Sequence, residues 1–236
     1  MIAKRIDRLV EWTKWPAAFA AVASIPLTSV AIFWQLSKSL GYPVFLVMFV
    51  AGFGLLCFAA RTSLGSSHWV KMLFGWLHDG TQAAVAMLML HPVVGIRKER
   101  VPDSSRVRWL GKGNWIMLVS PYIVPLSTIL LWLVSLLLFA SLRSAVLGFG
   151  LGLHLAYVGF QWNSGTSELR RLGRKFCWMF LPAANLAIAG FVFAFAIDGF
   201  SGAWGFGYDC ITMPWSAWEY VQNLVAGETE VVDTKK

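Results

Sequence analysis

Three polar side chains lie within five positions of an otherwise apolar stretch, GWLHDGTQAAV, at residues 75–85. They are His78, Asp79 and Gln82. If the stretch is helical, residues four apart share a face, so His78 and Gln82 project together, with Asp79 on an adjoining edge. An imidazole beside a carboxylate can bind a metal ion or take part in general acid–base chemistry.

The spacing matches the zinc motif HExxH, in which two histidines bind the metal and the glutamate acts as general base. Here the motif reads HDGTQ, from His78 to Gln82. Gln82 stands where the second histidine would be, and an amide carbonyl is a far poorer zinc ligand than an imidazole. Asp79 keeps the carboxylate of the base but is one methylene shorter, and proton transfer requires hydrogen-bond reach.

Two other histidines lie near the motif. His154 falls in a predicted span that runs parallel to the motif helix at a comparable depth, so it could approach His78 and Asp79, or it could only hydrogen-bond a neighbouring helix. His91 follows His78 by thirteen residues, which is about 20 Å along a helix. We therefore expect His91 to be an interfacial residue and not a ligand of the same ion.

The elements that position these residues are those of an integral membrane protein. The chain has 236 residues, of which 57% are hydrophobic and 14% charged, and this is too apolar for a soluble domain. Crossing a hydrocarbon layer of about 30 Å takes roughly 17 to 25 helical residues. Six stretches reach that length, the third interrupted by the polar motif: residues 15–37, 39–60, 72–96, 114–142, 144–167 and 176–197.

We therefore predict an all-α membrane protein, a bundle of about six transmembrane helices in which residues 1–226 form a single domain. The first segment is too long for the apolar region of a signal peptide, and we expect a retained helix. Tryptophans and tyrosines near the C-terminus predict an interfacial helix at residues 214–226, followed by a flexible tail at 227–236. A compact multi-span chain suits a bacterial inner membrane.

The net charge of +8 comes mostly from basic clusters beside the predicted spans. Such clusters orient a chain and meet anionic lipid, so we expect a lipid bilayer and not nucleic acid as the partner. The charges leave the orientation open. If all six spans cross the membrane, the basic loops lie in the cytoplasm and both termini lie outside. If the first segment lies on the membrane surface instead, the basic N-terminus is on the cytoplasmic side with these loops.

The order of motifs resembles that of the site-2-protease-like family of membrane-embedded zinc metallopeptidases. The run from Phe74 to Trp115 is similar to the family's motif helix, short hairpin and next span, and we expect strands at 96–101 and 106–110 joined by PDSS. The stretch LVSPYIVPLSTILL is similar to a proline-broken helix of the family. The stretch NSGTSELRRLGRKFCWMFLPAANLAI resembles the region with an acidic third ligand, here Glu168, ahead of a helix containing an asparagine, here Asn185.

The resemblance implies a zinc cofactor, a catalytic base and a peptide substrate. The zinc ligands would be drawn from His78, Gln82, Glu168 and His154, with Asp79 as the base. The substrate, a membrane protein or peptide, would lie along the hairpin at Ile96, Val101 and Val107, and near Asn185. An exposed strand of the hairpin could pair with an extended peptide by β-augmentation.

Because the motif is altered, three functions stay open. The first is a divergent member of this family that has lost or weakened hydrolysis and binds a membrane substrate or partner. The second is an unrelated six-span protein whose polar cluster lines a path for protons or a small solute. The third is an active metallopeptidase that uses His78, His154 and Glu168 as ligands. The family interpretation requires His78 and Glu168 to converge, whereas a transport path requires a polar lining that reaches both faces.

Overall fold

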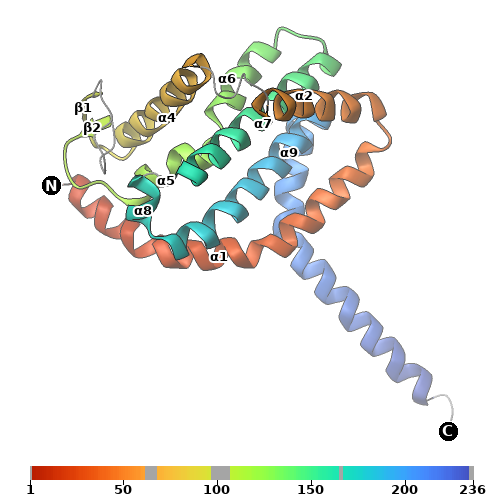
Figure 1. Ribbon diagram of the computed structural model, residues 1–236. Helices are drawn as coiled ribbons and strands as arrows, with labels where there is room; N and C mark the ends of the chain where they lie inside the picture. The colour runs from red at the N-terminus through yellow and green to blue at the C-terminus, as the bar shows by residue number, and fades with distance from the viewer. Residues whose placement is uncertain (1, 62–67, 97–106, 165–166, 234–236) are drawn as a thin grey trace.

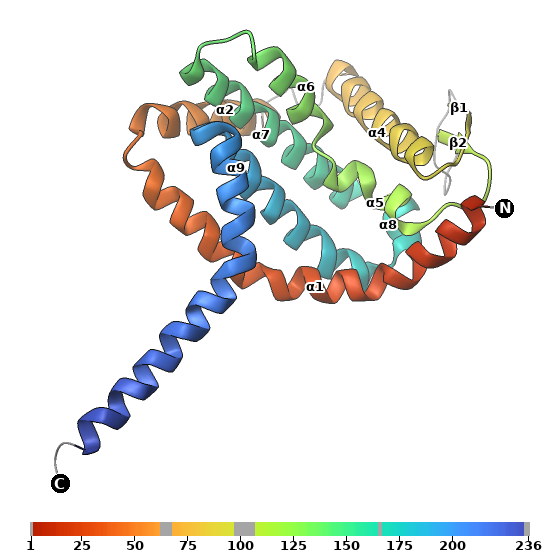
Figure 2. The ribbon, with the colours of Figure 1, turned by 180° about the vertical axis from the view of Figure 1, so that it is seen from behind.

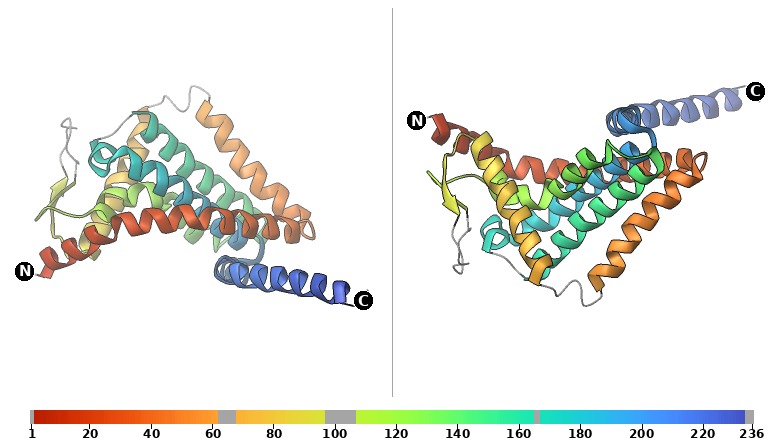
Figure 3. Two further views of the ribbon diagram at one scale, coloured as in Figure 1. Left: turned by 90° about the horizontal axis from the view of Figure 1, so that it is seen from below. Right: turned by 90° about the horizontal axis from the view of Figure 1, so that it is seen from above.

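The computed structural model describes residues 2–61, 68–96, 107–164 and 167–233, and nearly all of this part of the chain is helical (Figure 1). The elements in chain order are α1 (Ile2–Ser39), α2 (Pro43–Arg61), α4 (His68–Leu88), β1 (Val93–Ile96), β2 (Val107–Trp109), α5 (Trp115–Ile123), α6 (Leu126–Ser135), α7 (Ala140–Ser164), α8 (Ser167–Leu172) and α9 (Arg174–Asp233). The two ends of the chain lie at opposite ends of the molecule (Figure 3).

Three of the described helices are long and apolar enough to cross a membrane: Ala3–Ser39 in α1, Ser141–Trp162 in α7 and Arg174–Thr212 in α9. The pair α5 and α6, bent by 48°, adds a fourth if it is one span. The prediction of an all-α membrane protein is confirmed at this level, whereas six transmembrane helices are not. The third predicted span, 72–96, extends past the end of the helix, because α4 ends at Leu88 and residues 93–96 form a strand.

The longest helix, α9, is bent in its middle. The backbone leaves helical geometry at Asp198 and Gly199, and Gly199 has a φ of 61°, which glycine adopts without the steric cost of a side chain. Beyond the bend the helix turns back, so that Phe206 packs in one cluster with Ala194 and with Ala31 of α1. The two halves of α9 therefore pack together with the C-terminal part of α1.

The far end of α9 projects from the bundle as an arm (Figure 2). Residues 214–226, predicted to be helical, belong to this helix, and it continues through residues 227–233, which were assigned to the tail. The position of this segment at the membrane surface stays a prediction.

A β-hairpin follows the motif helix, as predicted. Its strands β1 and β2 are antiparallel, with Val93 opposite Trp109 and Ile96 opposite Val107. The first strand begins three residues earlier than the predicted 96–101. The connection at residues 97–106 lies outside the described part of the chain.

The span after the hairpin is broken by proline, as predicted. Pro125 has no backbone N–H and disfavours helical geometry in the residue before it, and Val124 is extended, with φ of −91° and ψ of 109°. The amide of Leu126 donates to the Val124 carbonyl at 2.8 Å and not to its helical acceptor, the Tyr122 carbonyl two residues earlier. The Tyr122 carbonyl therefore needs another donor.

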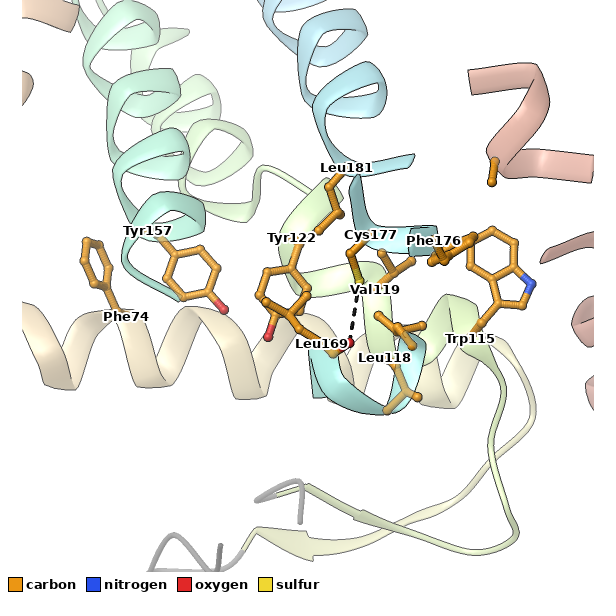
Figure 4. Packing of buried hydrophobic residues seen from close by; sticks show 12 residues of the cluster. Phe74, Trp115, Leu118, Val119, Tyr122, Tyr157, Leu169, Phe176, Cys177 and Leu181 are labelled. Carbon is orange, nitrogen blue, oxygen red and sulfur yellow. Dashed lines mark hydrogen bonds between the residues drawn. The ribbon is translucent and has the colours of Figure 1, made fainter. Parts of the chain in front are cut away.

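The largest group of buried apolar side chains surrounds α5, where α4, α7, α8 and α9 meet (Figure 4). Trp115 packs edge-on against Phe176 with ring centroids 5.3 Å apart. The rings of Tyr122 and Tyr157 stack at 6.3 Å. This packing holds α5 in the centre and places Tyr157 beside the motif helix.

His91 joins the hairpin to the start of α1. Its Nδ1 bonds the Leu110 carbonyl at 2.6 Å and its Nε2 bonds Asp7 at 2.9 Å, while the Asn114 side chain donates to the same Asp7 oxygen at 2.9 Å. A carbonyl and a carboxylate only accept hydrogen bonds, so both ring nitrogens carry protons and His91 is an imidazolium. His91 is only 1% exposed, and its position at the membrane interface stays a prediction.

This pair makes stability depend on pH. Burial by itself lowers the pKa of His91, but the hydrogen bond to Leu110 and the hydrogen bond and charge of Asp7 outweigh it and raise the pKa above 6.5. A raised pKa stabilises the folded state fully below pH 6.5, and the contribution is lost as the pH rises through the folded pKa. The midpoint temperature of thermal unfolding in detergent should therefore fall as the pH rises from 6.5 through the folded pKa of His91. The variant Asp7→Asn should make this midpoint less dependent on pH. An unchanged pH profile in Asp7→Asn would contradict the assignment.

Helices α2 and α7 touch through their backbones. A Cβ at Gly52 would lie 2.0 Å from the Ala145 carbonyl oxygen, and one at Gly148 would lie 2.1 Å from the Phe49 carbonyl oxygen. Small residues permit such close approach between helices in membranes. The two glycines fix the distance between α2 and α7.

We expect Gly148→Ala to destabilise the protein by about 1–3 kcal/mol, because the two backbones must separate. Gly159→Ala on the same helix is the matched control, since nothing lies within 4 Å of its added Cβ, and it should be neutral or slightly stabilising. Unfolding in detergent by added denaturing surfactant measures both. Equal loss of stability in the two variants would show that the close contact is not what Gly148 provides.

Candidate functional site

The motif residues lie in the middle of α4 and face into the protein. His78, Asp79, Thr81 and Gln82 are all buried, whereas Gly80 is exposed. The helix therefore presents its polar residues to the bundle, which an apolar surrounding tolerates only when they are bonded internally.

His78 is held from two sides. Its Nδ1 shares a hydrogen bond with the hydroxyl of Tyr157 on α7, and its Nε2 lies 3.8 Å from Glu168 Oε1 on α8. The ring of Tyr122 on α5 packs edge-on against the imidazole at 5.9 Å. Four elements thus fix the position and orientation of one side chain.

Glu168 reaches His78 because α8 is a short helix with two different faces. Its inner face carries Glu168, Leu169 and Leu172, all buried, and its outer face carries Arg170 and Arg171, both exposed. The Cys177 thiol of α9 donates to the Leu169 carbonyl at 3.6 Å (Figure 4). Burial of the two leucines therefore presses α8 inward and brings the carboxylate with it.

His154 belongs to a separate pair. Its Nε2 donates to Asn185 Oδ1 at 3.0 Å, and the Asn185 amide donates to the Tyr122 and Leu181 carbonyls at 3.0 and 2.9 Å. Asn185 thus supplies the donor that the Tyr122 carbonyl lacks at the proline break. These contacts make Asn185 a structural link between α5, α7 and α9.

The predicted hairpin residues contribute in different ways. Ile96 ends β1, and Val101 lies outside the described residues. The Val107 side chain is 3% exposed, so only its backbone is left for a peptide. Val94 on the other strand is 58% exposed.

The donor set does not fit a catalytic zinc ion. Such a site uses three protein ligands and an open position, but the described residues contain no group of three or more His, Cys, Asp or Glu side chains that could hold a metal. Only His78 and Glu168 of the predicted ligands lie close to each other. His154 is hydrogen-bonded to Asn185, and the amide of Gln82 is a poor zinc ligand. We therefore derive no chemistry through zinc.

His78 and Glu168 form a buried pair of an imidazole and a carboxylate, with their nearest atoms 3.8 Å apart. Close by, Thr81, Ser127, His154 and Tyr157 line a cavity of about 10 Å³, roughly the space for one water. The lining also includes the apolar residues Leu77, Pro121, Val124 and Leu126, so this small cavity has a mixed polar and apolar wall.

Tyr157 is the member of the site that the sequence analysis missed. It stands three residues after His154 in α7, within an apolar span where tyrosine is an ordinary residue. The only local sign of a special role is that this tyrosine hydroxyl lies inside the predicted span 144–167 and not near its ends. Its bond to His78 depends on how α4 and α7 pack.

The fold and this cluster define a helical protein with membrane-spanning helices and a buried polar site. No protein-family model, curated protein sequence or solved structure matches the chain.

We predict that His78 and Glu168 are energetically coupled. His78→Asn should cost about 3 kcal/mol, because it removes the imidazole beside a buried carboxylate. In a cycle with Glu168→Gln, the double variant should differ from the sum of the single variants by about 0.5–3 kcal/mol.

The control cycle pairs Glu168→Gln with His154→Asn. His154 bonds Asn185, so these effects should add to within about 0.5 kcal/mol. Additive behaviour of His78 and Glu168 in unfolding measurements would contradict the coupling.

Proposed function

We propose that this protein is a divergent relative of the site-2-protease-like membrane metallopeptidases, which binds a segment of a membrane protein without cleaving it at an appreciable rate. The observation that carries the proposal is the approach of His78 and Glu168. They are ninety residues apart in the chain, and their side chains lie 3.8 Å apart in the folded protein. The family pattern requires this convergence of a motif histidine with a later acidic residue.

The order of elements supports the same proposal. The motif helix α4 is followed by the hairpin, then by the broken pair α5 and α6. Glu168 on α8 precedes α9, which contains Asn185. Each feature alone is common in membrane proteins, and their succession together with the His78–Glu168 contact is what favours a relative of this family.

The donor set supports the proposed lack of hydrolysis. Peptide hydrolysis at such a site needs a metal-activated water, and a catalytic zinc ion needs more ligands than His78 and Glu168 supply. In our proposal the pair, with Tyr157, keeps the family's arrangement of helices without the catalytic ion.

The proposed binding edge is the hairpin beside α4. Strands at an open edge offer backbone N–H and C=O groups to an extended peptide, and Val94 places an apolar side chain on the surface there.

The proposal includes six membrane crossings, with α2 and α4 in addition to α1, α5–α6, α7 and α9, and location in a bacterial inner membrane. The 21 residues of α4 span about 31 Å at 1.5 Å per residue, close to the hydrocarbon thickness.

Site-specific photocrosslinking in native membranes tests the binding edge. A photoreactive phenylalanine at Val94 should give a reproducible polypeptide adduct whose crosslinked residues lie in an extended segment beside a transmembrane helix. The matched control is the same residue at Leu137, which is 89% exposed on the α6–α7 connection and should give lipid adducts. Lipid adducts alone at both positions would contradict peptide binding.

Metal content tests the loss of hydrolysis separately. Element mass spectrometry of the detergent-purified protein should find far less than one zinc ion per chain, with no change in His78→Ala. Near-stoichiometric zinc that disappears in His78→Ala, together with cleavage of the crosslinked partner, would overturn this part and favour an active metallopeptidase.

A further inference from the structure

We infer that a cavity at the junction of α7, α8 and α9 binds the phosphate of an anionic phospholipid headgroup. The cavity has a volume of about 370 Å³ and is lined by Trp162, Leu169, Arg170, Arg174, Cys177 and Trp178. It lies outside the His78 cluster and is independent of the function proposed above.

Two guanidinium groups give the cavity its chemistry. Arg170 and Arg174 line it and both are exposed, and arginine forms paired, charge-assisted hydrogen bonds to phosphate oxygens. Residues 168–175 hold four basic side chains and one acid. That acid, Glu168, is buried toward His78, so the outer surface of this segment is positive.

The helix α9 begins at Arg174, which is one of the residues that line the cavity. The Cys177 amide donates to the Gly173 carbonyl at 3.1 Å, which closes the first turn. The amides at residues 174–176 come earlier and have no acceptor within the helix. Such amides, with the positive end of the helix dipole, favour a phosphate group.

The position of the cavity identifies the source of that phosphate. Trp162 ends one candidate span, Ser141–Trp162, and Arg174 begins another, Arg174–Thr212, so the cavity lies where the hydrocarbon gives way to headgroups. The indoles of Trp162 and Trp178 pack edge-on at 4.9 Å, and tryptophan concentrates at this depth. A lipid phosphate is held there by its acyl chains, whereas a free phosphate is not.

The charge also selects the kind of lipid. Aromatic rings attract a choline group, but two guanidinium groups beside it repel that cation. The phosphate of an anionic headgroup is attracted by both guanidinium groups. Basic pockets between membrane helices recognise anionic headgroups in this way.

Native mass spectrometry of the detergent-purified full chain tests the site, with phosphatidylglycerol and phosphatidylcholine as probes. The wild-type protein should bind phosphatidylglycerol more tightly than phosphatidylcholine. The variant R170Q/R174Q should lose about tenfold more affinity for phosphatidylglycerol than the matched control R171Q/K175Q. Both variants remove two positive charges from exposed side chains in the same segment, but only the first alters the cavity.

Equal losses in the two variants, or equal binding of the two lipids, would overturn the site and leave only general attraction between the basic segment and lipid. Displacement of bound phosphatidylglycerol by millimolar inorganic phosphate would overturn the lipid as occupant. If R170Q/R174Q does not fold, R170K/R174K keeps the charge while removing the guanidinium geometry. Its control is R171K, because residue 175 is already a lysine. R170K/R174K should bind phosphatidylglycerol more weakly than R171K, and equal affinity would again overturn the proposal.

Discussion

Polar groups inside a membrane bundle must find partners within the protein, because hydrocarbon offers none. The break before α6 shows how far the structure depends on this constraint. The Tyr122 carbonyl loses its helical donor there, and Asn185 supplies one at 3.0 Å. His154 in turn donates to Asn185. A single interrupted hydrogen bond thereby ties together α5, α7 and α9, the three helices around which the buried cluster is built.

The same constraint explains the motif helix. His78 is bonded to Tyr157 and faces Glu168, so a group that is costly in lipid is compensated on both ring nitrogens. The three side chains come from α4, α7 and α8, and their contact inside the bundle is the observation on which the proposed function is based.

The short helix α8 connects the interior with the membrane surface. Its buried face brings Glu168 to His78, and its exposed face brings Arg170 to the cavity beside α9. A lipid phosphate held at that cavity would bear on the helix that positions the carboxylate. The buried pair and the proposed headgroup site are separate in chemistry, but both include residues of α8.

The sequence by itself determined the class of protein, the helical architecture, the hairpin after the motif helix and the proline break, because composition, hydrophobic length and turn residues act locally. It left the number of membrane crossings open, because the described helices that are long and apolar enough to cross a membrane do not include α2 and α4. Only the tertiary structure decided that His78 meets Tyr157 and Glu168, that His154 meets Asn185, and that His91 is buried against Asp7. The reason is physical: these partners are brought together by helix packing, and the free energy that selects one packing is spread over many apolar contacts that no local pattern records.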